Sequence, residues 1–276
     1  MDKVNKWVSK HKIIAFVLYN LICWVPFLVL ALTVEIRLIW WIVFGMLVLF
    51  ASAMFVTSIE RHILNKAVKL QNEQCDPNPF LEIIERQLSI VKSKSYQQLL
   101  LINKAAALRD LGRFDEVFSI LSSINIDQYN TTLPLTKIVY YNNLTDILII
   151  NGEYFQANIW HSKMMQMISD LKANEKQKKQ LNEIPVLNQA ELFIAGNNFS
   201  EAERLINGLP ESISNRQRIS KCLIYAKLLI KQNRKDEAEE YLQFVIDYGN
   251  KLYDATEAKQ MLEQMGKDGN RESTIF

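Results

Sequence analysis

The chain has 276 residues, of which 49% are hydrophobic, with eight glycines, six prolines and a formal net charge of +2. This charge is too small to indicate a nucleic-acid partner, and the few glycines and prolines argue against an all-β fold with many tight turns. Three cysteines, Cys23, Cys75 and Cys222, show no CxxC or Cys/His spacing, so we expect reduced thiols and no metal site.

Two apolar runs follow a basic N-terminal segment. Residues 13–32 and 38–59 carry no charged side chain, and residues 33–37 form a polar break between them. About twenty helical residues cross the hydrocarbon core of a bilayer, so these runs predict a transmembrane helical hairpin. Asn20 lies within the first run and needs a hydrogen-bond partner, which we expect on the other helix of the hairpin.

The outer flanks of the two runs carry the positive charge. Arg61, Lys66 and Lys69 follow the second run, and four lysines precede the first. Since an excess of Lys and Arg marks the cytoplasmic side, we expect a multi-pass protein of a bacterial cell membrane with both termini in the cytoplasm. We expect the four N-terminal lysines to contact anionic membrane lipid: Lys3, Lys6, Lys10 and Lys12.

The helical pattern of the second run continues to about residue 71. Pro77 and Pro79 follow a few residues later and disfavour helix in the residues before them. This pattern predicts four segments. They are a membrane anchor (1–71), a linker (72–79), a helical repeat domain (80–265) and a disordered tail (266–276).

A repeated pattern extends from about residue 96 to residue 249. Four stretches align on Val117, Ala157, Ala202 and Ala238, which follow one another after 40, 45 and 36 residues. Twelve residues before each of these positions stands a small residue: Ala105, Thr145, Ala190 and Ala226. A turn former lies between: Gly112, Gly152, Gly196-Asn197 and Asn233. Each unit therefore predicts a helix that ends at a left-handed Gly or Asn, and a second helix that crosses the first at the small residues.

These stretches resemble the tetratricopeptide repeat (TPR). Residues 111–117 and 151–157 match the turn and the start of the second helix in that family, and residues 198–202 and 234–238 carry weaker versions. The spacing departs from the family's 34 residues. The resemblance implies an all-α fold, in which the N-terminal transmembrane hairpin is followed by a TPR-like α-solenoid. It also implies a groove, lined by the first helices of the pairs, that takes a peptide or a partner helix.

The sequence contains no nucleotide-binding, metalloprotease, hydrolase or paired-carboxylate motif, so we expect neither an enzyme nor a cofactor. His161 occupies a core-facing repeat position, where a packed imidazole is more common than a ligand. We interpret the chain as a membrane-anchored scaffold that docks a protein or peptide partner, and no nucleic acid, at the cytoplasmic membrane face. The residues expected to contact the partner lie on first helices: Asn103, Tyr140, Asn143, Asn188, Tyr225 and Lys227.

A second interpretation stays open. In this interpretation the chain is an integral-membrane assembly subunit or a small transporter partner, and the helical hairpin, rather than the repeat domain, carries out the function. Transport normally requires more strongly polar groups in the membrane than Asn20, the single amide side chain of the two uncharged runs.

Overall fold

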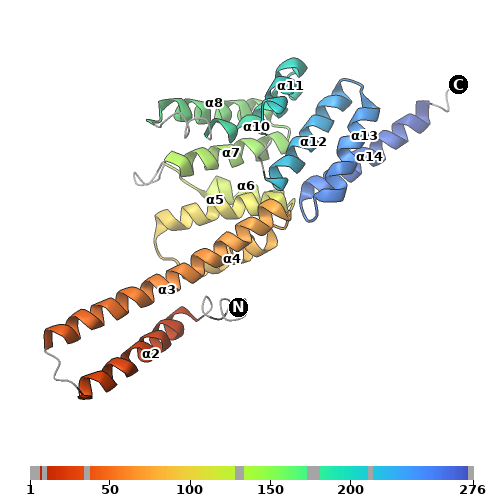
Figure 1. Cartoon of the computed structure of the whole chain (residues 1–276). Coiled ribbons are helices and arrows are strands. Elements are labelled where there is room, and N and C mark those ends of the chain that lie inside the picture. Colours follow the sequence, from red (N-terminus) through yellow and green to blue (C-terminus); the bar gives the residue numbers. More distant parts are fainter. Residues whose placement is uncertain are drawn as a thin grey trace. The chain divides into compact units, whose positions relative to one another are not determined.

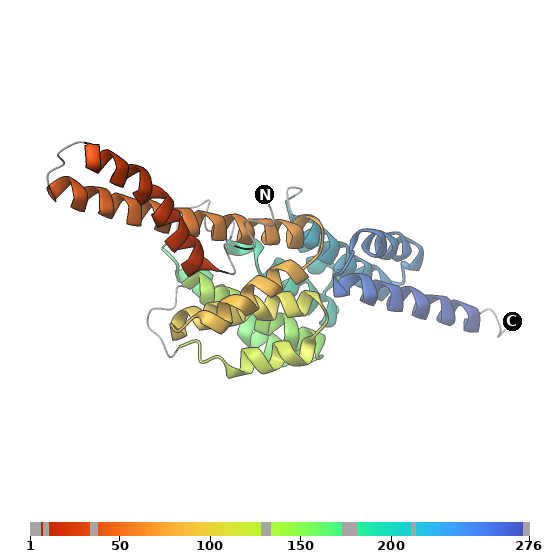
Figure 2. The same ribbon diagram turned by 90° about the horizontal axis from the view of Figure 1, so that it is seen from below.

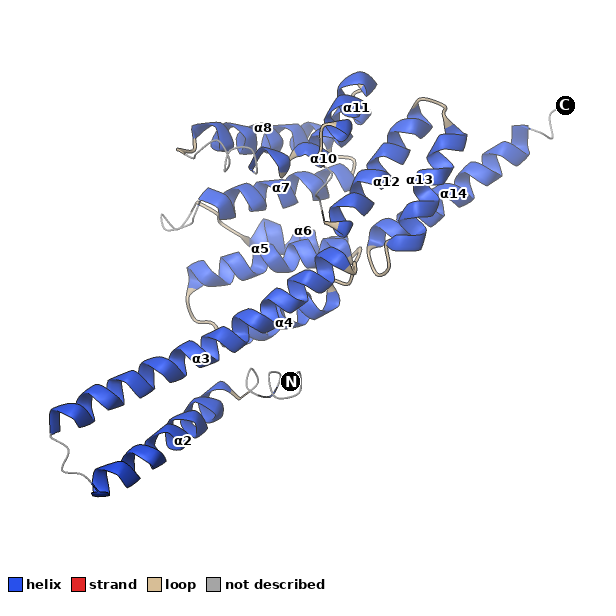
Figure 3. Cartoon of the chain, in the orientation of Figure 1, coloured by secondary structure: helices blue, strands red, loops and turns tan. Residues whose placement is uncertain are grey.

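The computed structural model describes residue 7 and residues 11–33, 38–127, 134–172, 181–210 and 214–272. These residues form α-helices, and no strand occurs among them (Figures 1 and 3). The predicted all-α class is therefore confirmed. The chain divides into two compact units, Met1–Val68 and Lys69–Phe276.

The first unit is a helical hairpin. It consists of α2 (Lys12–Thr33) and the part of α3 (Leu38–Glu73) that precedes residue 69. The two helices lie side by side and antiparallel (Figure 2). Between them, Asn20 Nδ2 donates a hydrogen bond to Ser52 Oγ at 3.1 Å. This bond confirms that the polar residue of the first apolar run finds its partner on the other helix.

The transmembrane assignment of this hairpin does not find support in the structure. Helices do form over residues 13–32 and 38–59, yet none of the helices, as far as their residues are described, is long and apolar enough to cross a membrane. The predicted lipid contacts of Lys3, Lys6, Lys10 and Lys12 fall on side chains outside the described residues.

The second unit is a series of antiparallel helix pairs. The pairs are α5–α6, α7–α8, α10–α11 and α12–α13, and the first helix of each pair contacts the first helix of the next (Figure 1). α4 precedes the pairs and packs on α5, while α14 follows them and packs on α13. In chain order, the helices are α4 (Asn78–Ile90), α5 (Lys94–Asp110), α6 (Phe114–Ser123), α7 (Pro134–Ile150), α8 (Tyr154–Asp170), α10 (Val186–Ala195), α11 (Phe199–Asn207), α12 (Asn215–Lys231), α13 (Lys235–Tyr248) and α14 (Tyr253–Glu272).

Each pair turns at a residue with positive φ, as the sequence predicts. These residues are Gly112 (73°), Gly152 (76°), Asn197 (57°) and Asn233 (62°). The next backbone N–H returns to a carbonyl of the first helix, for example from Arg113 to Leu108 at 2.9 Å. This is the hydrogen-bond pattern that ends helices at a left-handed residue.

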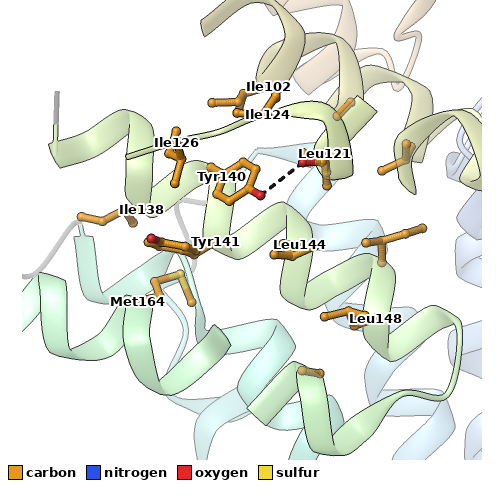
Figure 4. Packing of buried hydrophobic residues seen from close by; sticks show 14 of the residues in the cluster. Ile102, Leu121, Ile124, Ile126, Ile138, Tyr140, Tyr141, Leu144, Leu148 and Met164 are labelled. Atoms are coloured by element: carbon orange, nitrogen blue, oxygen red, sulfur yellow. Dashed lines mark hydrogen bonds between the residues drawn. The ribbon is translucent and has the colours of Figure 1, made fainter. Parts of the chain in front are cut away.

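The small residues predicted at the helix crossings are buried. Ala105, Thr145, Ala190 and Ala226 each have no exposed surface. Their counterparts on the second helices, at Val117, Ala157, Ala202 and Ala238, are at most 1% exposed. The largest apolar cluster fills the space around α5, α6, α7 and α8, and Figure 4 shows this cluster around Tyr140 and Tyr141. The predicted alignment of the repeats therefore places the core residues correctly.

The two ends of the series meet. The start of α14 contacts α5, and the ring of Tyr253 packs edge-on against that of Phe114, with 4.7 Å between the centroids. The C-terminal helix thus closes back onto the first pair, which the repeat pattern did not predict.

Two predicted segment boundaries differ from the structure. The segment expected to be a linker is packed into the second unit, because Cys75 and Pro77 are buried and Lys251 Nζ lies 2.8 Å from Asp76 Oδ2. Burial raises the pKa of the Cys75 thiol to about 11. At the other end α14 continues to Glu272, so residues 266–272 are helical rather than disordered. Residues 273–276 lie outside the described residues.

Candidate functional site

Two of the residues predicted to contact a partner are buried in the repeat unit. Tyr140 is 7% exposed, and its hydroxyl donates to the Leu121 carbonyl at 3.2 Å (Figure 4). Asn188 is 6% exposed, and its Nδ2 donates to the carbonyl of Asn142 at 3.0 Å. Both side chains therefore hydrogen-bond to a neighbouring helix, and each also lines a cavity.

Three further residues of the predicted site are half-buried. Asn143 Nδ2 on α7 donates to the Ile102 carbonyl of α5 at 3.2 Å. The Tyr225 hydroxyl on α12 donates to Glu203 Oε1 of α11 at 3.0 Å. Asn103 lies on α5. Asn143 and Asn188 line one cavity, whereas Tyr140 and Tyr225 each line a different one, so the predicted residues do not form a single site.

Lys227 is the sixth predicted residue and lies at the centre of an ion-pair cluster. Its Nζ is 2.9 Å from Glu191 Oε1 of α10 and 2.8 Å from Glu257 Oε1 of α14. Burial alone would lower the pKa of Lys227, but the two carboxylates outweigh it and the pKa is raised. Lys227 is thus charged and ties three helices together.

A second ion cluster joins the first pair to α14. Arg109 at the end of α5 donates from Nε to Asp146 Oδ2 (2.7 Å) and from Nη1 to Asp254 Oδ1 (2.8 Å). Ser220 Oγ donates to the other oxygen of Asp254 at 2.6 Å. Asp254 is 1% exposed, and although burial raises its pKa, Arg109 and Ser220 outweigh this and hold the pKa below its usual value.

The neighbouring Asp110 extends this cluster towards α3. It is 1% exposed and accepts from Arg216 Nη1 at 3.1 Å and from Gln71 Nε2 at 2.9 Å. Sequence reasoning missed both aspartates and both arginines, because charged residues next to a turn are normally solvated. Only their burial distinguishes these residues from ordinary surface charges, and this burial depends on the contact between α14 and the first helix pair.

An open groove of about 630 Å³ lies beside these clusters. We call it the α14 groove. Apolar side chains from the α7–α8 turn, α10 and α14 form much of its lining, and the charged side chains come from α10, α12 and α14. Its lining includes Phe114, Ile149, Ile150, Tyr154, Ile194, Tyr253 and Met261, with Glu191, Lys227, Lys231 and Glu257.

The charges of the groove largely compensate one another. Lys227 is neutralised by Glu191 and Glu257, which leaves the exposed Lys231 as the additional cation. Ile150 and Tyr154 remain 37% and 45% exposed at the α7–α8 turn. The groove therefore suits a mainly apolar occupant more than a strongly charged one.

Metal binding has no candidate group in the described part of the chain, where no three His, Cys, Asp or Glu side chains are arranged to hold an ion. His161 is 7% exposed and packs in α8, as its repeat position predicts. Comparisons with protein-family models, with curated proteins and with solved structures found no match.

Proposed function

We propose that the chain is a membrane-anchored docking module. In this proposal the α2–α3 hairpin is held in a lipid bilayer with both termini in the cytoplasm, and the TPR-like helix pairs form a solenoid that binds a protein partner. The observation that carries the proposal is the α14 groove, an open hollow in which exposed apolar side chains lie beside charges that largely compensate one another. The partner would insert apolar side chains against Ile150 and Tyr154.

The hairpin supports the membrane part of the proposal through its outward-facing side chains. Ile22 is 69% exposed and Phe50 is 66% exposed, while the polar Ser52 is fully buried between the helices. Proteins in water rarely expose apolar surface of this extent, whereas paired helices in lipid place small and polar residues at their contact. A Cβ at Gly45 would lie 3.3 Å from Trp24, so a small residue occupies this contact too.

Liposome flotation of the full chain tests the anchor. The wild type should float with the vesicles, and the Ile22→Glu/Phe50→Glu variant should remain largely in the dense fraction, because two carboxylates oppose burial in lipid. A matched control, Ile90→Glu/Phe155→Glu, adds the same charge at exposed apolar positions of the second unit and should float like the wild type. Equal flotation of both variants would contradict the anchor.

Proximity labelling in cells tests the groove. Tyr154→Ser should remove the labelled partner, while Phe155→Ser should keep it, because Phe155 is 77% exposed but does not line the groove. Replacing residues 13–59 by an unrelated hairpin should also keep the partner. If the hairpin exchange removes the partner and Tyr154→Ser does not, the hairpin is the working part and the docking proposal fails.

A further inference from the structure

A second cavity lies on the other face of α12, and its chemistry differs from that of the α14 groove. We call it the α12 pocket. It has a volume of about 470 Å³ and is lined by Ile206, Asn207, Pro210, Arg218, Lys221, Cys222, Tyr225 and Tyr241. Arg218 and Cys222 each precede a groove lysine by nine residues, which is two and a half helical turns, so the pocket and the groove use opposite faces.

The charged side chains among the described residues that line this pocket are two cations, Arg218 and Lys221. Among the described residues, neither Arg218 nor Lys221 forms an ion pair or a side-chain hydrogen bond. The guanidinium of Arg218 lies over the ring of Phe244, 4.9 Å from its centroid, which limits its freedom without neutralising its charge. Both cations act on Cys222, whose thiol pKa burial raises and the two cations lower.

Two uncharged hydrogen-bond donors also line the α12 pocket, beside the two cations. The Asn207 amide and the Tyr241 hydroxyl line the pocket and, within the described part of the chain, make no hydrogen bond. Tyr241 is fixed by an edge-on contact with Tyr225, with 4.9 Å between the ring centroids. The hydroxyl of Tyr225 is already used on Glu203. Four donor side chains without a hydrogen-bond acceptor in the described part of the chain thus line this cavity.

The walls of the pocket are apolar and aromatic. Ile206 is 1% exposed, and Pro210 and the two tyrosine rings are half-buried. A small hydrated anion would leave these walls uncovered. An acidic peptide segment, in contrast, places carboxylates on the cations and an apolar side chain against the rings, and charge-assisted hydrogen bonds of this kind are the strong ones.

We propose that the α12 pocket binds an acidic peptide segment of a protein partner, in which an apolar side chain lies between two carboxylates. Arg218 and Lys221 hold the carboxylates, Asn207 and Tyr241 donate to them, and the apolar side chain packs on Ile206 and Pro210. This site is independent of the α14 groove, so Tyr154→Ser should leave it unchanged.

Fluorescence anisotropy with a labelled Gly-Glu-Phe-Glu-Gly peptide and the full chain in detergent micelles tests the proposal. Arg218→Gln/Lys221→Gln should weaken binding at least tenfold, about 1.4 kcal/mol. The control Lys259→Gln/Lys267→Gln removes the same net charge outside the pocket and should change binding less than twofold. The Gly-Gln-Phe-Gln-Gly peptide should also bind at least tenfold more weakly.

Alkylation of the wild type gives a second readout that needs no variant. The peptide should slow iodoacetamide modification of Cys222, followed by mass spectrometry, and should leave the buried Cys75 unaffected. Equal binding by the pocket and control variants would overturn the proposal, as would unchanged alkylation at saturating peptide. Displacement of the peptide by equimolar inorganic phosphate, or by phosphatidylserine vesicles, would overturn the peptide as the ligand.

Discussion

Two glycines with the same backbone conformation differ in what surrounds them. Gly112 and Gly152 both have a φ near +75°, but a Cβ on Gly112 would lie 2.9 Å from Tyr253 Cγ, whereas nothing lies within 4 Å of one on Gly152. We expect Gly152→Ala to cost about 1–2 kcal/mol of unfolding free energy from the left-handed backbone alone. Gly112→Ala should cost about 1–3 kcal/mol more, because Tyr253 must move.

Chemical denaturation of both variants measures this difference. Because Tyr253 begins α14, hydrogen exchange in the first turn of α14 should accelerate in Gly112→Ala and stay unchanged in Gly152→Ala. Equal losses of stability would mean that α14 does not close onto the first helix pair.

His161 predicts a pH dependence of stability. Burial lowers its pKa, and neither ring nitrogen has a hydrogen-bond partner. With the folded pKa below the unfolded value, stability is complete above about pH 6.5 and is lost as the pH falls, by up to about 1.4 kcal/mol per unit. His161→Leu should remove this slope, measured by denaturation between pH 7.5 and 5, while His62→Leu at an exposed position should keep it.

At the scale of the helices, the sequence predicted what depends on local geometry. The turn positions could be recognised from Gly or Asn because few other residues adopt positive φ. In the third pair, where Gly196 and Asn197 are adjacent, Asn197 is the residue with positive φ. The small residues were recognisable because two helices cross closely only where side chains are short. Both signals lie within one repeat, so they can be read without the rest of the fold.

The sequence did not show how the predicted contact residues of α7 are used within the fold, because a buried helix has no free face. α7 lies between α5, α8 and α10 and buries side chains in nearly all directions, among them Tyr140, Tyr141, Leu144 and Ile147. Helical periodicity identifies an exposed face in a helix at the surface, but a helix that is buried on nearly all sides has no such face to identify. Tyr140 therefore looked available in sequence and is used internally.

α10 offers a direct test of the predicted crossings. Ala190 is fully buried where α10 meets α11, while Ala195 on the same helix is exposed. Ala190→Leu should cost about 1–3 kcal/mol by overpacking. Ala195→Leu should stay within about 0.5 kcal/mol of the wild type in the same thermal denaturation. Similar melting temperatures for the two variants would mean that the crossing is placed incorrectly.

At the scale of the repeat unit, the deciding contacts join residues that are far apart in sequence. Arg109 and Asp254 are separated by 145 positions, and Arg216 and Asp110 by 106. No periodic pattern connects such residues, since each repeat specifies only its contacts to the next. The closure of α14 onto α5 follows from the summed geometry of all pairs, which is why the sequence did not predict it or the aspartates and arginines that bridge it.

Arg109 is the residue on which this closure depends most. Arg109→Gln leaves the buried Asp254 and the partly buried Asp146 without their cation. Such a loss typically costs 3–5 kcal/mol, and we expect about 3 because 23% of the Arg109 side chain is exposed. Arg113→Gln breaks an exposed pair with Glu116 three positions along the chain and should cost about 0–1 kcal/mol. Denaturation of the full chain at pH 7 compares the two variants.

The pH dependence separates this electrostatic role from simple packing. In the wild type the lowered pKa of Asp254 gives stability that is present above about pH 4 and is lost as the pH falls through the folded pKa. In Arg109→Gln the pKa of Asp254 rises without its cation, and the pKa of Asp146, which burial already raises in the wild type, rises further, so protonation relieves their cost. The stability gap between wild type and Arg109→Gln should therefore shrink from pH 7 to pH 4.5, and a constant gap would mean that Arg109 acts by packing alone.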